Sequence, residues 1–232
     1  MQSRTRIGNL TTILFCSSKG SWWSALIVSI FVCMIETSAI ATTYYVDFSK
    51  GSDTNNGSSK TSPWKHIKGM TGCTNTCNST VILGGDTVIF KGGETWTASY
   101  PWTFQGGSSS MVTYTTDQSW FSGGSWTLPT FDNQGTHPGA TGMANMANSG
   151  YVTLNKLKFV NAGIALPTAG SGNADKAIVF TNCHDITIIN STFETESWVT
   201  FYFVFSAAGS YSNFVLAGND FSHTSGAVWM AT

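Results

Sequence analysis

Charge is scarce in this sequence, and positive charge most of all. Charged residues make up 10% of its 232 residues, well below the roughly 25% of ordinary soluble domains. Both arginines, Arg4 and Arg6, precede residue 42, and residues 42–232 contain eight lysines against eleven acidic residues, a net charge of −3. A chain so poor in basic residues is not expected to bind nucleic acid, because phosphate binding needs concentrated positive charge.

Aromatic residues and glycine are plentiful instead. The chain has nine tryptophans, 15 phenylalanines and 24 glycines. This aromatic content argues against a disordered chain, because disordered chains are poor in such residues. Few charges combined with many hydroxyl and amide side chains are typical of an exported, strand-rich protein rather than of a helical bundle.

The first 41 residues have the order of an export signal. Basic residues come first, an uncharged apolar run follows at Trp22–Ile35, and Ala39 and Ala41 supply the small residues of a cleavage site. The run has 14 residues, whereas a helix needs about 20 to cross a bilayer. We predict a signal peptide over residues 1–41 and a secreted or cell-surface protein. The alternative is an uncleaved anchor, which is the only membrane contact we expect.

Three cysteines follow the predicted signal peptide. Cys73 and Cys77 lie four residues apart in a polar loop, which predicts a small disulfide loop in an oxidising compartment. Half of a zinc site is the alternative, but it lacks a second ligand pair at the usual spacing. Cys183 follows an apolar run, and we expect it to be buried.

The exported part begins with elements that predict a closed end. Thr43–Asp47 alternates and is rich in β-formers, which predicts a strand, and residues 51–57 have the Gly, Asp and Asn of a tight loop. Ser62–Met70 predicts a short helix, because Ser62 can cap it and Pro63 suits its first turn. Its apolar residues recur every third position, so the helix would cover an open core.

An approximate repeat occupies the last third of the chain. Each of three units begins with an apolar residue, has another two positions later and ends in Phe: Val152–Phe159, Ile186–Phe193 and Phe214–Phe221. The starts are 34 and 28 residues apart. Each unit also has an asparagine near its turn, at Asn155, Asn190 and Asn219.

Strands of this kind bury their apolar side by stacking coil upon coil around one core. Asparagine suits the left-handed bends between such strands. Long amphipathic helices between the units would indicate an α/β fold, and regular hairpin turns an antiparallel sandwich; the sequence shows neither. We therefore predict an all-β, parallel β-helix over residues 42–232, with Leu154, Ile188 and Leu216 in one column. The sequence stops just after the third unit, so we expect the N-terminal part of a solenoid, truncated at its far end.

Three stretches resemble a known group of proteins. They are YYVDFSKGSDTNNGSSKTSPWKHIKGM (44–70), GGDTVIFKGGETW (84–96) and the repeat units themselves. Over about residues 43–230 the chain resembles secreted proteins of the pectate-lyase-like right-handed parallel β-helix superfamily. The resemblance implies a right-handed solenoid whose first strand, loop and helix cap one end. It also implies a polysaccharide partner, but this superfamily includes lyases, glycoside hydrolases and adhesive proteins, so fold leaves function open.

Aromatic residues between positions 94 and 135 are interleaved with glycine and serine. They have two interpretations. The rings could stack on sugars at the surface, or they could pack in the core and under loops.

A polyuronate lyase needs a base and positive charge near the substrate carboxylate. The resemblance implies lysine or arginine in this role, often with calcium. The candidates are Lys156, Lys158 and Lys176. We expect Lys156 and Lys158 to flank Leu157 on one strand and to face the same way. A solvated strand face is the alternative.

A glycoside hydrolase instead needs two carboxyl groups about 5–5.5 Å or 6.5–9.5 Å apart. On an extended strand Glu194 and Glu196 would face the same way, about 6.5–7 Å apart. Asp185 and Asp220 are further candidates. Ordinary acidic turn residues are the alternative for all four.

Two other groups of residues could carry chemistry. His184, beside Asp185, and His223 could act as acid or base, but the G-x-S-x-G nucleophile motif is lacking and surface histidines are the alternative. A second group, Asp53, Asn55 and Asn56, could bind calcium through oxygen or only form a turn. Its spacing lacks the terminal glutamate of an EF-hand.

The sequence thus supports two functions. One is a monomeric, secreted enzyme that acts on polysaccharide as a lyase or glycoside hydrolase. The other is a non-enzymatic surface or matrix protein that binds glycans or cells, or an inactive fragment of such a protein.

Overall fold

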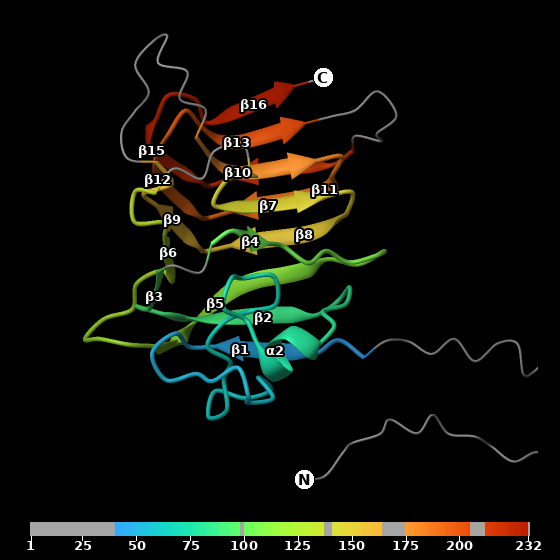
Figure 1. Cartoon of the computed structure of the whole chain (residues 1–232), viewed down its shortest axis with the longest axis vertical. Helices are drawn as coiled ribbons and strands as arrows, with labels where there is room; N and C mark the ends of the chain where they lie inside the picture. Colours follow the sequence, from blue (N-terminus) through green and yellow to red (C-terminus); the bar gives the residue numbers. More distant parts are fainter. Residues whose placement is uncertain (1–39, 98–99, 137–140, 164–174, 205–211, 232) are drawn as a thin grey trace, which may run out of the picture. The chain divides into compact units, whose positions relative to one another are not determined.

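The computed structural model describes residues 40–97, 100–136, 141–163, 175–204 and 212–231. Almost all of the predicted signal peptide, residues 1–39, lies outside this part. The described residues form 16 strands and one short α-helix (Figure 1). No helix among them is long and apolar enough to span a bilayer.

The strands form three parallel sheets. Sheet A has the order β1-β2-β5-β8-β11-β14, with bounds Thr43–Val46, Thr87–Gly92, Val112–Phe121, Gly150–Asn155, His184–Ile189 and Phe214–Ala217. Sheet B has the order β4-β7-β10-β13-β16, with bounds Trp102–Thr103, Ala144–Ala147, Lys176–Thr181, Val199–Val204 and Val228–Ala231. Sheet C has the order β3-β6-β9-β12-β15, with bounds Thr95–Thr97, Thr130–Asp132, Lys158–Val160, Thr192–Ser197 and Asp220–Thr224.

From β2 onward, each strand pairs with the strand that comes three places later in the chain. Each coil therefore gives one strand to each sheet. The first coil is β2-β3-β4 and the last is β14-β15-β16 (Figure 1). This is the predicted parallel β-helix, because an antiparallel sandwich would pair consecutive strands. The right-handed sense implied by the resemblance stays a prediction.

The register confirms the predicted column of apolar residues. Leu154 pairs with Ile188, and Ile188 pairs with Leu216, in three successive coils of sheet A. A second column in sheet C consists of aromatic rings, one per coil: Trp96, Phe131, Phe159, Phe193 and Phe221. Neighbouring rings in it are stacked with centroids 5.0–5.4 Å apart. The repeated Phe that ends each sequence unit is therefore a core position.

The predicted helix over Ser62–Met70 does not form. Trp64 instead bridges to Val46 of β1, its N–H donates to the Tyr45 carbonyl and its carbonyl accepts from the Asp47 N–H, both at 2.9 Å. This pairing holds the backbone extended, which a helix cannot allow. The helix comes later, as α2 at Asn75–Ser79. The apolar side chains of the predicted helix are nevertheless buried in the core, as expected for a cover: Trp64, Ile67 and Met70.

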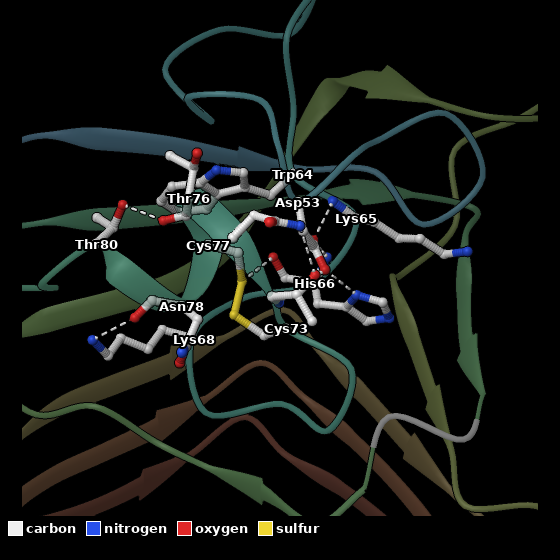
Figure 2. The surroundings of a disulfide bond; sticks show 12 residues. Asp53, Trp64, Lys65, His66, Lys68, Cys73, Thr76, Cys77, Asn78 and Thr80 are labelled. Carbon is white, nitrogen blue, oxygen red and sulfur yellow. Dashed lines mark hydrogen bonds and ion pairs between the residues drawn. A yellow bond between two sulfur atoms is a disulfide. The ribbon is translucent and has the colours of Figure 1, made fainter. Parts of the chain in front are cut away.

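Asp53 forms hydrogen bonds to several parts of the segment that covers this end of the core (Figure 2). Its Oδ1 accepts from the backbone N–H of Lys65 and of His66, at 3.2 and 2.9 Å. Its Oδ2 lies 2.8 Å from His66 Nδ1 and accepts from the Thr74 N–H at 3.3 Å. Burial acts to raise the pKa of Asp53, but the hydrogen bonds, chiefly from His66, outweigh it and lower that pKa. One carboxylate thus joins the turn, the extended segment and the start of α2.

The predicted disulfide between Cys73 and Cys77 is present, with Cα atoms 5.7 Å apart (Figure 2). Cys77 lies in α2 and is buried. Cys183 is a buried free thiol, as predicted, and burial raises its pKa to about 11.

We expect the double substitution of Cys73 and Cys77 by serine to lower the free energy of unfolding by about 2 kcal/mol, the loop-entropy value for so short a loop. Urea denaturation with and without reductant measures the loss. Reductant should destabilise the native protein and leave the serine variant unchanged. A native protein that is insensitive to reductant would contradict the prediction.

Candidate functional site

The structure brings together one lysine of the predicted lyase site and one glutamate of the predicted hydrolase site. Lys158 Nζ lies 2.9 Å from Glu194 Oε2, between neighbouring strands β9 and β12 of sheet C. Both side chains are partly exposed, because they alternate with the buried rings Phe159 and Phe193. The Glu196 side chain lies outside the part that the structure describes.

The prediction that Lys156 and Lys158 flank Leu157 on one strand is wrong. β8 ends at Asn155 and β9 begins at Lys158, so a corner separates the two lysines. Lys156 has a φ of 57°, the left-handed conformation that the bend requires. It follows the Asn155–Ile189 register pair, so it occupies the same corner position as Asn190, whose φ is 52°. The sequence pattern missed the corner because lysine is an unusual residue there.

The three lysines of the predicted lyase site lie in different places. Lys156 is at a corner, Lys158 is on sheet C and Lys176 begins β10 of sheet B.

His184 and Asp185 form a pair at the start of β11. His184 Nδ1 lies 2.8 Å from Asp185 Oδ2, and Asn213 Nδ2 donates to Asp185 Oδ1 at 2.7 Å. These hydrogen bonds, Asn213 first and His184 second, lower the pKa of Asp185. Gly150 of the preceding coil leaves the space for the imidazole, since a Cβ there would overlap His184 Nδ1. The contact with Asp185 therefore fixes the orientation of the His184 imidazole.

His223 and Asp220 lie apart from this pair, on β15 of sheet C. Asp220 is exposed and pairs in register with Thr192.

The side chains of the three calcium candidates are engaged in hydrogen bonds with the protein itself. Asp53 accepts hydrogen bonds from the backbone N–H groups described above. Asn55 Nδ2 donates to the Pro63 carbonyl at 2.8 Å, and Asn56 Oδ1 accepts from the Ser58 N–H at 3.0 Å. Each contact belongs to the turn. Among the described residues, His, Cys, Asp and Glu form no group of three suited to a metal ion.

A buried charged cluster lies where β1 meets β2, and sequence reasoning did not find it. Lys91 Nζ lies 2.8 Å from Asp47 Oδ2 and 4.0 Å from Glu94 Oε1. Ser49 Oγ donates to Glu94 Oε1 at 2.8 Å, and all three charged side chains are buried. The Trp120 ring lies 5.9 Å from Lys91 Nζ. The cluster ties the first strand to the first coil, and no sequence signal marks partners that are 44 residues apart.

The aromatic residues between 94 and 135 are mostly core residues. Five of them are buried: Trp96, Trp102, Phe104, Tyr114 and Phe131. For these five the core-packing interpretation is confirmed. Their sugar-stacking interpretation is wrong, because a buried ring has no face open to a ligand.

Aromatic rings that are at least partly exposed gather elsewhere, on the outer face of sheet B. Tyr202 stands between the buried Phe201 and Phe203 on β13, so it points outward. It pairs in register with Trp229 of β16 in the next coil, and Trp229 is 50% exposed. Trp198, at the corner before β13, lies 5.2 Å from the Trp229 ring and 6.0 Å from the Tyr202 ring. We call Trp198, Tyr202 and Trp229 the sheet B aromatic cluster.

Lys176 supports this cluster from the previous coil. Its Nζ lies 4.7 Å from the Tyr202 ring centroid and 5.8 Å from that of Trp198. These are cation–π distances. The lysine is buried, and desolvation lowers its pKa, partly offset by the neighbouring Asp175 carboxylate. Its ammonium is therefore in position to hold the two rings, a role that the sequence pattern did not suggest.

Comparison with known proteins adds a likeness in fold. No protein-family model and no curated protein matches the sequence. Two crystal structures of a GH136 lacto-N-biosidase from Eubacterium ramulus match the structure, each at 14% sequence identity. The TM-scores are 0.57 for the selenomethionine derivative and 0.55 for the native protein.

The match covers much of this chain and a minor part of the other. It spans 86% and 83% of this chain but only 36% and 35% of the lacto-N-biosidase chains. At this identity the likeness concerns the fold, and the placement in the pectate-lyase-like superfamily stays a prediction.

Proposed function

We propose that this chain belongs to an exported, carbohydrate-active protein and that its sheet B aromatic cluster binds glycans. The main support for the proposal is that the rings of Trp198, Tyr202 and Trp229 lie together on the outer face of sheet B. Large aromatic rings elsewhere on the chain, such as Trp64, Trp96 and Trp102, are fully buried. One exposed ring, Trp229, and two partly exposed rings, from two successive coils, indicate a binding surface rather than core packing.

Such a surface suits sugars for a physical reason. A pyranose ring has C–H groups on its faces and hydroxyl groups at its rim. Its C–H groups can contact the electron-rich face of an aromatic ring, and each such contact is weak but several act together. Tryptophan and tyrosine also have an N–H or O–H that can meet the hydroxyl groups at the rim.

Two further observations support the proposal. The fold is like that of a lacto-N-biosidase, a glycoside hydrolase by its GH136 name. The Cys73–Cys77 disulfide favours an oxidising compartment outside the cytosol. Export through a signal peptide at residues 1–41 is part of the same proposal.

Cleavage of the glycan is a second candidate function, and the Lys158–Glu194 pair favours it. This pair offers a carboxyl group and a positive charge on a partly exposed strand face. Incubation with a polysaccharide panel, with and without calcium, tests it. New reducing ends without unsaturated products would indicate a hydrolase, and new reducing ends together with unsaturated products a lyase. If neither product forms, the cleavage proposal is refuted for the glycans of the panel.

Alanine substitutions in the cluster test the binding proposal. We expect Trp198→Ala and Trp229→Ala each to weaken glycan binding about tenfold, which corresponds to about 1.4 kcal/mol. Isothermal titration with the best oligosaccharide of a panel measures the change. Phe121→Ala is the control, because Phe121 is also an exposed aromatic residue but belongs to β5 of sheet A. Equal affinities for all three variants and the native protein would refute the assignment.

A further inference from the structure

The glycan site of the preceding proposal lies on a sheet with almost no charge. The strands of sheet B contain a single charged residue, Lys176 at the start of β10. Sheet C differs, because its strands contain Asp132, Lys158, Glu194, Glu196 and Asp220. The two faces therefore offer different chemistry to a ligand.

The one charge on sheet B is already engaged. Lys176 Nζ lies against the Tyr202 and Trp198 rings, and the carboxylate of Asp175 acts on it from the adjacent position. Both residues are buried. An acidic sugar would have to draw this ammonium away from the rings and from the neighbouring carboxylate, and it would lose its own hydration on binding.

The polar groups on the same face are neutral. Asn145 of β7 is partly exposed and pairs in register with Val179 of β10, which pairs with Tyr202 of β13. Thr103 of β4 is exposed, and its Oγ1 donates to Asn145 Oδ1 at 3.1 Å. Amide and hydroxyl groups match the hydroxyl groups of a sugar and do not neutralise a carboxylate.

Resting on the proposed glycan binding, we infer that the sheet B aromatic cluster selects neutral glycans and rejects uronates and other acidic sugars. This face thus differs from a polyuronate site, which needs an accessible positive charge beside the substrate carboxylate.

The test compares neutral with acidic ligands of equal length. Cellotetraose and xylotetraose are the neutral probes and tetragalacturonate is the acidic probe, each titrated into the whole chain. We expect a neutral probe to bind at least about tenfold more tightly, a difference of about 1.4 kcal/mol. Its affinity should change less than about twofold between about 50 and about 500 mM salt, because screening acts only on charges. Tighter, salt-sensitive binding of tetragalacturonate would overturn the inference and leave glycan binding intact.

Lys176→Met gives an independent readout, since methionine keeps much of the apolar stem and removes the charge. We expect it to weaken neutral-probe binding several-fold through loss of ring support and to leave tetragalacturonate binding weak. Loss of tetragalacturonate binding from a tight native value would mean that Lys176 contacts the acidic sugar, against the inference. Absence of binding by every probe and by the wider panel would refute the proposed function itself.

Discussion

Phe193→Ala is expected to lower the free energy of unfolding by about 3–5 kcal/mol, the usual cost of removing a buried phenylalanine. Phe193 is fully buried. Its ring stacks between Phe159 and Phe221, both at 5.4 Å, and meets Phe201 edge-on at 4.7 Å. The substitution therefore leaves a cavity in the middle of a column of rings. Its neighbours belong to strands held by the sheet hydrogen bonds, so they are poorly placed to fill that cavity.

Guanidinium denaturation followed by far-UV circular dichroism measures this loss. Phe121→Ala is the matched control, because the same side chain is 38% exposed there and its removal should change stability by less than about 0.5 kcal/mol. A loss below about 1 kcal/mol for Phe193→Ala would contradict the position of Phe193 in the core.

Lys91→Met is expected to cost about 3–5 kcal/mol, because it leaves the buried carboxylates of Asp47 and Glu94 without their cation. The exposed pair Lys60–Asp117, with 2.6 Å between its charged atoms, provides the comparison. There Lys60→Met should cost less than about 1 kcal/mol, because solvent screens an exposed pair. Restoring the balance with Asp47→Asn in the Lys91→Met background should recover part of the loss.

The same cluster predicts how stability depends on pH. Burial acts to raise the pKa of Asp47, but hydrogen bonds from Lys91 and the Lys50 N–H outweigh it, and the folded-state pKa lies below its ordinary value of 3.8. A lowered carboxyl pKa stabilises the fold above that ordinary value and loses its effect as the pH falls through the folded value. Unfolding measurements from neutral to acidic pH should show this loss in the native protein and a smaller one in Asp47→Asn. Equal acid sensitivity of the two proteins would contradict the role of Asp47.

Much of the fold could be predicted because apolar residues recur at the same positions in each sequence unit. That recurrence is visible in the sequence without knowledge of which distant residues pack together. Phe159, Phe193 and Phe221 recur at the same place in each unit, and their stacking follows from that period. Trp96 and Phe131 occupy the same column, but no sequence unit marks them. β5 starts with the same alternation as the later units, but a long insertion separates it from Phe131 of β6, so the spacing that identifies the later units is lost.

The cover and the binding face could not be predicted in the same way. Ser62–Met70 has good local helix signals, but Asp53 and β1 compete for its backbone groups, and these contacts come from other parts of the chain. The sheet B aromatic cluster depends on the faces that the corners give to Trp198 and Tyr202. The sequence shows which residues carry aromatic rings, but the geometry of the corners determines whether each ring lies in the core or on the surface.

Glycan binding at sheet B can be tested directly by following the indole N–H signals of the tryptophans during a titration with a neutral tetrasaccharide. Two-dimensional ¹H–¹⁵N NMR resolves these signals, and single tryptophan-to-phenylalanine variants assign them. We expect progressive shifts for Trp198 and Trp229 and none for the buried Trp102. Shifts confined to other tryptophans, or binding that leaves Trp198 and Trp229 unchanged, would contradict the assignment of the glycan site to sheet B.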